Sequence, residues 1–72
     1  MVPLEFLQES KNKNVKVHTT NKNCYIGKLV NFDTYVNIVL SNAKMCDFET
    51  CVETALGNTI IQGNLVTFIE VL

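Results

Sequence analysis

The spacing of apolar positions changes along the chain and separates a helical beginning from a strand-rich remainder. Leu4 and Leu7 lie three residues apart, Glu5 would stand in a first helical turn and Pro3 at its first position. This pattern predicts a short N-terminal helix that ends in the polar run at 11–14. Because isolated helices shorter than about a dozen residues are unstable in water, the helix needs a surface to lie on.

From Val15 onward the apolar period is two, which is typical of half-buried strands. Two strand-like runs, VKVHT and CYIGKLVNF, are separated by polar residues, and a third run covers 36–45 with Val36 on its apolar face. Gly27 interrupts the second run. A glycine there predicts a sharp bend or a close backbone approach, which lets a short sheet curl towards a barrel.

The pattern weakens after the third run. Residues 46–58 fit a hairpin tip or an irregular loop better than a core strand. Two short apolar runs follow, TII and LVTFIEVL, and the segment between them, Gln62-Gly63-Asn64, is predicted to be a tight turn because glycine and asparagine tolerate positive φ. Residues 1–72 are therefore expected to form one domain, with one short helix followed by about five strongly bent strands.

The last apolar run carries apolar residues on both faces. Leu65, Ile69 and Val71 are predicted on one face, and Val66, Phe68 and Leu72 on the other. A small barrel has only one interior, so an edge strand with two apolar faces indicates an aggregation liability or a subunit contact. The alternative is that the N-terminal helix covers the second face with its own apolar stripe.

Composition excludes several kinds of site. Three cysteines without a C-x-x-C pair and a single histidine indicate neither a disulfide framework nor a zinc site, so no metal or cofactor is expected. The thiols are expected to be reduced, as in a cytosolic or nuclear protein, with a Cys46–Cys51 bridge as the alternative. The sequence shows no signal-peptide pattern and no apolar run of membrane length, so no membrane partner is expected.

Charge and motif content point away from catalysis. The chain has no Ser/His/Asp set, no glycine-rich phosphate loop and no paired carboxylates at an evident site, so it is not expected to be an enzyme. The net charge of −1 argues against strong, sequence-independent binding of nucleic acid by this chain alone.

The turn FDTYVN concentrates Asp33, Tyr35 and Asn37 within five residues. A tyrosine ring can stack on a base, and an asparagine amide offers a donor and an acceptor that complement the edge of uracil. A spacing of two places Tyr35 and Asn37 on the same side if the strand extends that far. The alternative is that Tyr35 caps the barrel and Asn37 bonds to its own turn.

The order of these elements and the residues in them resemble the Sm and Sm-like (LSm) RNA-binding proteins over nearly the whole chain. The first family motif is similar to residues 15–43, through Gly27, Asp33, Tyr35, Asn37 and Leu40. The second is similar to residues 60–71, through Ile61, Gly63 and Asn64. The opening PLEFL, together with IGKLVNFDTYVN, resembles a branch of Sm-like proteins more than the core Sm proteins.

The resemblance implies a mainly β Sm fold, a small open barrel made of a short helix and a five-stranded, strongly bent antiparallel sheet. It also implies a non-catalytic subunit of a six- or seven-membered ring, in which the fourth strand of one subunit pairs with the fifth of the next. The partners would be other Sm-like subunits and uridine-rich single-stranded RNA such as the 3′ end of U6 snRNA, in splicing or mRNA decay, in the nucleus and/or the cytoplasm. The implied subunit interface comprises Leu65, Val66, Phe68 and Leu72.

The family's base pocket falls on the same turn. By resemblance, Tyr35 stacks on the base, Asn37 reads its edge and Asp33 stabilises the turn. The second motif completes the pocket with Gln62, Gly63 and Asn64. The family usually has Arg or Lys where this chain has Gln62, which brings no charge and weakens the expected site. A small-barrel protein-interaction module with an idle pocket is therefore the alternative function.

Overall fold

The computed structural model describes residues 4–47, 49–50 and 52–72. A short helix, α1 (Leu4–Ser10), precedes five strands, and a single 3-10 turn (Gly63–Leu65) joins the last two. The strands are β1 (Asn14–Thr19), β2 (Asn23–Phe32), β3 (Ile38–Asp47), β4 (Glu53–Ile61) and β5 (Val66–Val71). Pro3, predicted at the first helical position, lies outside the described residues. So does Cys51, the partner of Cys46 in the alternative disulfide.

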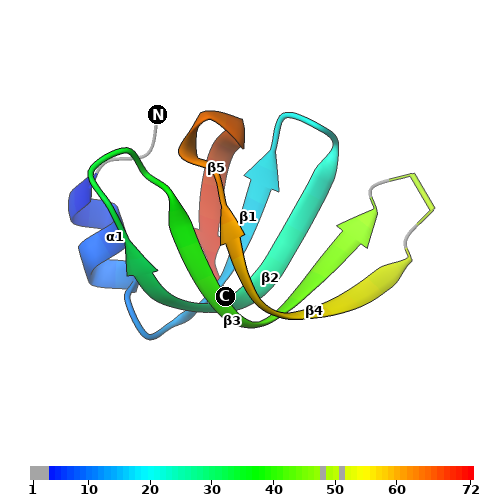
Figure 1. The fold of residues 1–72 in the computed structure, drawn as a ribbon, viewed down its shortest axis with the longest axis horizontal. Helices are drawn as coiled ribbons and strands as arrows, with labels where there is room; N and C mark the ends of the chain where they lie inside the picture. Colours follow the sequence, from blue (N-terminus) through cyan, green and yellow to red (C-terminus); the bar gives the residue numbers. More distant parts are fainter. Residues whose placement is uncertain (1–3, 48, 51) are drawn as a thin grey trace.

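All five strands belong to one antiparallel sheet with the order β4-β3-β2-β1-β5. The sheet is strongly bent and α1 lies beside one end of it (Figure 1). The predicted fold, a short helix followed by a bent five-stranded sheet, is confirmed. Within the described chain β4 and β5 are the two edges of the sheet, so each presents one side of its backbone without a strand partner.

Gly27 lies where β2 bends. A Cβ atom at this position would come 3.0 Å from the carbonyl oxygen of Ser41 and 3.1 Å from the Cα atom of Ala43. The register between β2 and β3 also shifts between Ile26 and Lys28. The close backbone approach predicted from the glycine is therefore present.

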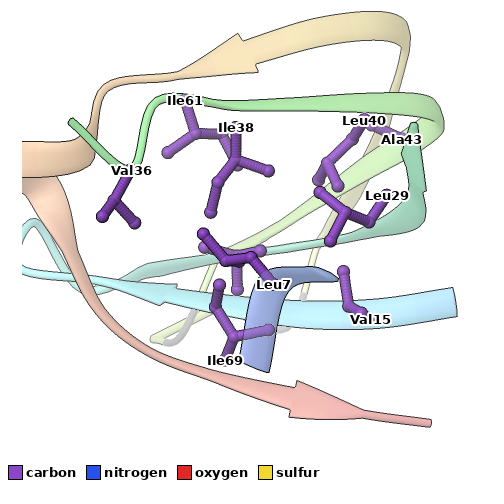
Figure 2. Packing of buried hydrophobic residues seen from close by; sticks show 10 residues of the cluster. Leu7, Val15, Leu29, Val36, Ile38, Leu40, Ala43, Ile61 and Ile69 are labelled. Atoms are coloured by element: carbon purple, nitrogen blue, oxygen red, sulfur yellow. The ribbon is translucent and has the colours of Figure 1, made fainter. Parts of the chain in front are cut away.

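The core lies between the facing parts of the bent sheet and is completed by α1. Leu7 is fully buried. In Figure 2 it lies between Ile38 and Ile61 on one side and Val15 and Ile69 on the other. Burying a leucine side chain contributes about 1.5–3 kcal/mol relative to leaving it exposed. The helix therefore has the surface that its short length requires, although Leu4 remains 37% exposed.

The expectation of a hairpin tip or loop over 46–58 is wrong for much of that segment. β3 continues to Asp47 and β4 begins at Glu53. Every residue from 53 to 58 is exposed, so this part of β4 has no buried face that would produce an alternating apolar pattern. Gly57 adds a local irregularity with φ of +69°.

A β-bulge changes which residues of β5 face the core. His18 of β1 lies opposite Phe68, but the next residue, Thr19, lies opposite Val66, so Thr67 is the extra residue. The bulge turns Val66 towards the interior, where it is half-buried and packs against the core. The prediction that Val66 shares the outer face with Phe68 is therefore wrong.

The remaining apolar residues of the C-terminal run are divided between the two faces. Ile69 is buried and Leu65 is half-buried. Phe68 and Leu72 are 48% and 64% exposed, so α1 does not cover their face. Val71, predicted on the same face as Ile69, is 44% exposed at the end of the edge strand. No helix among the described residues has the length and apolar character needed to cross a membrane.

Candidate functional site

The turn between β2 and β3 is organised by the carboxylate of Asp33. Its Oδ1 accepts hydrogen bonds from the backbone N–H groups of Tyr35 and Asn37, at 2.9 and 3.1 Å. Its Oδ2 accepts a third, at 2.9 Å, from the side-chain Nδ2 of Asn37. These bonds stabilise the ionised carboxylate and lower the pKa of Asp33, the side-chain bond from Asn37 having the largest effect.

The backbone of this turn is not extended. Val36 has φ of +63°, an uncommon value for a β-branched residue, and its N–H donates to the carbonyl oxygen of Asp33 at 3.1 Å. The expectation of an extended strand running from residue 36 is therefore wrong, because β3 begins at Ile38. The turn buries Val36 in the core and leaves Tyr35 79% exposed.

Asn37 connects this turn with the turn between β4 and β5. Its Oδ1 accepts a 2.7 Å hydrogen bond from the backbone N–H of Gly63. Since the side chain also donates to Asp33, one N–H and one acceptor position of the amide remain for a ligand. The amide is thus both part of the scaffold and available in part for recognition.

Gly63 is required here for a reason other than the one predicted. Its φ is not positive, and neither is that of Asn64. A Cβ atom on Gly63 would instead overlap the carbonyl oxygen of Tyr35 and lie 2.9 Å from the carbonyl carbon of Val36. Only a residue without a side chain lets the two turns approach this closely.

The two turns enclose an open hollow of about 840 Å³. Tyr35 and Asn37 contribute from the first turn, and Gln62 and Asn64 from the second. Gly63 lies between Gln62 and Asn64 in the chain, and its backbone N–H donates a hydrogen bond to Asn37. The structure therefore brings the predicted base-site residues together from segments far apart in the sequence.

The charge of the hollow is negative rather than positive. Asp33 is one of its lining residues, and no lysine is among them in the described part of the chain. Gln62 is exposed and can donate a hydrogen bond without adding charge. A ligand held here would depend on stacking and hydrogen bonds, because the lining residues that the structure describes offer no cation to attract phosphate.

Sequence reasoning missed part of the lining of this hollow. Phe32, Val39 and Ile60 also line it. Ile60 and Ile61 look equivalent in the sequence, yet Ile60 is 71% exposed and Ile61 is buried. The period of two within a strand was the available signal, because adjacent residues point to opposite faces and only one isoleucine can enter the core.

Apolar side chains also lie exposed along the two edge strands. On β4 these are Leu56 and Ile60, 38% and 71% exposed. On β5 and just beyond it they are Phe68, Val71 and Leu72. The other two predicted interface residues, Leu65 and Val66, are half-buried. Each edge therefore combines an unpaired backbone with exposed apolar surface.

Comparison with known proteins identifies the fold. Residues 5–71 match the LSM domain family. The chain belongs to the LSM domain family. No curated protein sequence matches this LSM-domain chain.

Solved structures resemble the LSM-domain chain over all or nearly all of its length. The Pyrococcus abyssii Sm protein, solved in complex with a uridine heptamer, is 28% identical with a TM-score of 0.88, and each chain covers 100% of the other. A heptameric archaeal Sm protein is 28% identical with a TM-score of 0.85, over 94% of this chain and 97% of that one. The Sm-like protein AF-Sm2 from Archaeoglobus fulgidus is 30% identical with a TM-score of 0.84, over 100% and 96%.

Proposed function

We propose that this LSM-domain chain is a non-catalytic subunit of a ring of Sm-like proteins that binds uridine-rich single-stranded RNA. One observation carries the proposal: the exposed ring of Tyr35 lies in an open hollow with Asn37, Gln62 and Asn64. Single-stranded RNA is recognised through unstacked bases that stack on aromatic rings and bond through their edges. The uridine heptamer bound to the Pyrococcus abyssii relative supports uridine as the base.

The two edge strands, β4 and β5, which lack a strand partner on one side within the described chain, support ring assembly. In the proposed ring, β4 of one subunit pairs with β5 of the next, which places the half-buried Leu65 and Val66 and the exposed Phe68 and Leu72 at or beside the seam. Heterologous pairing that closes into a ring leaves no strand edge unpaired. The heptameric archaeal relative supports seven subunits, and six is the alternative.

The finer part of the proposal concerns the cellular ring. The opening PLEFL and the run IGKLVNFDTYVN resemble the fifth subunit of the U6 snRNA-associated Sm-like ring. We infer that the chain joins other Sm-like subunits on the uridine-rich 3′ end of U6 snRNA in pre-mRNA splicing, or on mRNA ends during decay, in the nucleus and/or the cytoplasm.

The test combines assembly and RNA contact. Native mass spectrometry of the purified chain, and then of its cellular complex, gives the subunit number and shows whether the partners are copies or paralogues. Photo-crosslinking of the assembled ring to a uridine heptamer is expected to mark Tyr35 and the segment 62–64. A ring that retains the RNA without any crosslink in these two turns would contradict the assignment of the pocket.

A protein-interaction module with an idle pocket is the second candidate. It is favoured by the state of the hollow: Asn37 already bonds to Asp33 and Gly63, and the described residues that line the hollow include no cation. A ring that assembles fully and shows no measurable affinity for uridine heptamer would replace the first proposal with this one.

A further inference from the structure

Two cysteines lie side by side on neighbouring strands, away from the base-site hollow. Cys24 of β2 is directly opposite Cys46 of β3 in the strand register. Directly opposite residues of antiparallel strands have Cα atoms about 4.5 or 5.5 Å apart, and disulfides span Cα separations of about 4.4–6.8 Å. Both thiols are free. The register therefore already brings this pair within bonding range without a shift of either strand.

The Cys24 side chain also contacts the backbone of Cys46. The Sγ atom of Cys24 lies 3.8 Å from the carbonyl oxygen of Cys46. Burial, followed by the adjacent Cys24 thiol, raises the pKa of Cys46. The raised pKa keeps the Cys46 thiol mostly protonated, which slows its reaction with oxidants and favours the reduced state at rest.

The two cysteines differ in accessibility. Cys46 is half-buried, whereas Cys24 is only 9% exposed. Cys24 lines a second hollow, of about 390 Å³, together with His18 and Phe68. The more exposed Cys46 is therefore expected to react first, and Cys24, which lines the second hollow, is expected to react second.

We propose that Cys24 and Cys46 form a reversible dithiol–disulfide site that takes low-molecular-weight disulfides, with oxidised glutathione as the representative. The Cys46 thiol loses its proton to solvent, and the thiolate attacks one sulfur of the reagent, which releases one glutathione thiolate. Cys24, also deprotonated, then attacks the Cys46 sulfur of the mixed disulfide and releases the second. The pair loses two protons and two electrons, and the reagent disulfide gains the two electrons.

The bond would cross-link residues 22 positions apart in the sequence that are already neighbours in the sheet. It therefore restricts the unfolded chain more than the folded one, and the oxidised protein should melt at a higher temperature than the reduced protein. A reducing glutathione pool keeps both cysteines as thiols, so the disulfide would form only under oxidising conditions.

The full chain with Cys51→Ser is the test protein, because it keeps only the proposed pair. After incubation with oxidised glutathione and quenching, free thiols are counted under denaturing conditions and disulfides are located by peptide mass spectrometry. We expect the thiol count to fall from two to zero, with Cys24 linked to Cys46, no glutathione retained, an upward shift in Tm, and full reversal by dithiothreitol.

The matched control carries Cys24→Ala as well as Cys51→Ser. Its Cys46 is expected to keep one glutathione as a stable mixed disulfide, because no second thiol can displace it. The proposal fails if the Cys51→Ser chain retains both thiols or a stable mixed disulfide. It also fails if the bridge forms only in urea, or if the unsubstituted chain links Cys46 to Cys51 instead.

Discussion

The side-chain Oδ1 of Asn37 accepts a 2.7 Å hydrogen bond from the backbone N–H of Gly63, 26 residues further along the chain. This bond joins the turn after β2 to the turn after β4. The Nδ2 of the same Asn37 amide donates a 2.9 Å hydrogen bond to the carboxylate of Asp33. The shape of the hollow therefore depends on a chain of contacts from Asp33 through Asn37 to Gly63.

Gly63→Ala should destabilise the protein because its Cβ has no space. The added atom would overlap the carbonyl oxygen of Tyr35, and backbone cannot move aside as a flexible side chain can. Overpacking of this kind typically costs about 1–3 kcal/mol or more. Urea-induced unfolding followed by circular dichroism measures the change in the free energy of unfolding.

Gly57→Ala is the matched control for Gly63→Ala. Gly57 has φ of +69° and nothing within 4 Å of an added Cβ, so its substitution introduces backbone strain of about 1–2 kcal/mol without a clash. Equal stability of the Gly63→Ala variant and the wild type would show that the two turns do not approach as closely as described.

The hydrogen bonds to Asp33 should appear in its titration. Its pKa is lowered below the usual aspartate value of 3.8, so the carboxylate contributes stability to the turn above that pH and loses it as the pH falls through the lower, folded-state pKa. NMR signals of the Gly63 backbone amide and the Asn37 side chain should therefore change with a midpoint below 3.8.

Two variants test the cause of this titration. In Asp33→Asn the transition should be absent, because the new side chain carries no titrating group. In Asn37→Ala the midpoint should move up towards 3.8, since the side-chain hydrogen bond is the largest contribution to the shift. An unchanged midpoint in Asn37→Ala would refute the assigned cause.

Tyr35→Ala should weaken the binding of a uridine heptamer to assembled rings. Loss of base stacking is worth about 1–3 kcal/mol per engaged base, and we expect the lower end because Gln62 supplies no cation. Tyr35 is 79% exposed, so its replacement should leave the fold of the subunit intact. Fluorescence anisotropy measures the affinity, and Tyr35→Phe, which keeps the stacking surface, should bind nearly as well as the wild type.

Asn37→Ala should change base preference rather than affinity alone. Stacking on Tyr35 tolerates any base, whereas the amide edge distinguishes uracil. Rings of this variant should bind uridine and adenosine heptamers more nearly alike than wild-type rings do. Since Asn37 also holds Gly63, ring size must first be checked by sedimentation. If intact rings of this variant keep the full preference for uridine, Asn37 does not distinguish the base.

Phe68→Glu should dissociate the ring by placing a charge on the outer face of β5. Phe68 is 48% exposed and stacks on His18 with ring centroids 4.1 Å apart, so it has no full cover within the subunit. Sedimentation velocity should show smaller species. Ile60→Glu, on the opposite edge strand β4, should have a similar effect, and Leu4→Glu on α1 serves as the exposed control. Rings of full size in both edge variants would place the seam elsewhere.

Elements that bury one face in a regular pattern can be predicted from the order of residues alone. The alternation of Val15 and Val17 with polar residues predicts β1, and the spacing of Leu4 and Leu7 predicts α1, because each element buries one face and leaves the other in water. Gly27 also predicts the close backbone approach that is found there. Gly63 predicts only a tight turn, and the reason a glycine is needed is the space beside Tyr35 and not its φ.

Features that depend on contacts between residues far apart in the sequence emerge only in the folded chain. The outer part of β4 has no buried face, so no apolar period could reveal it. The bulge at Thr67 turns Val66 inward, which a strict alternation of residues cannot express. Likewise, Asn37 and Gly63 each carry an ordinary local preference for turns, and only the bend of the sheet brings their turns within hydrogen-bonding distance and creates the hollow between them.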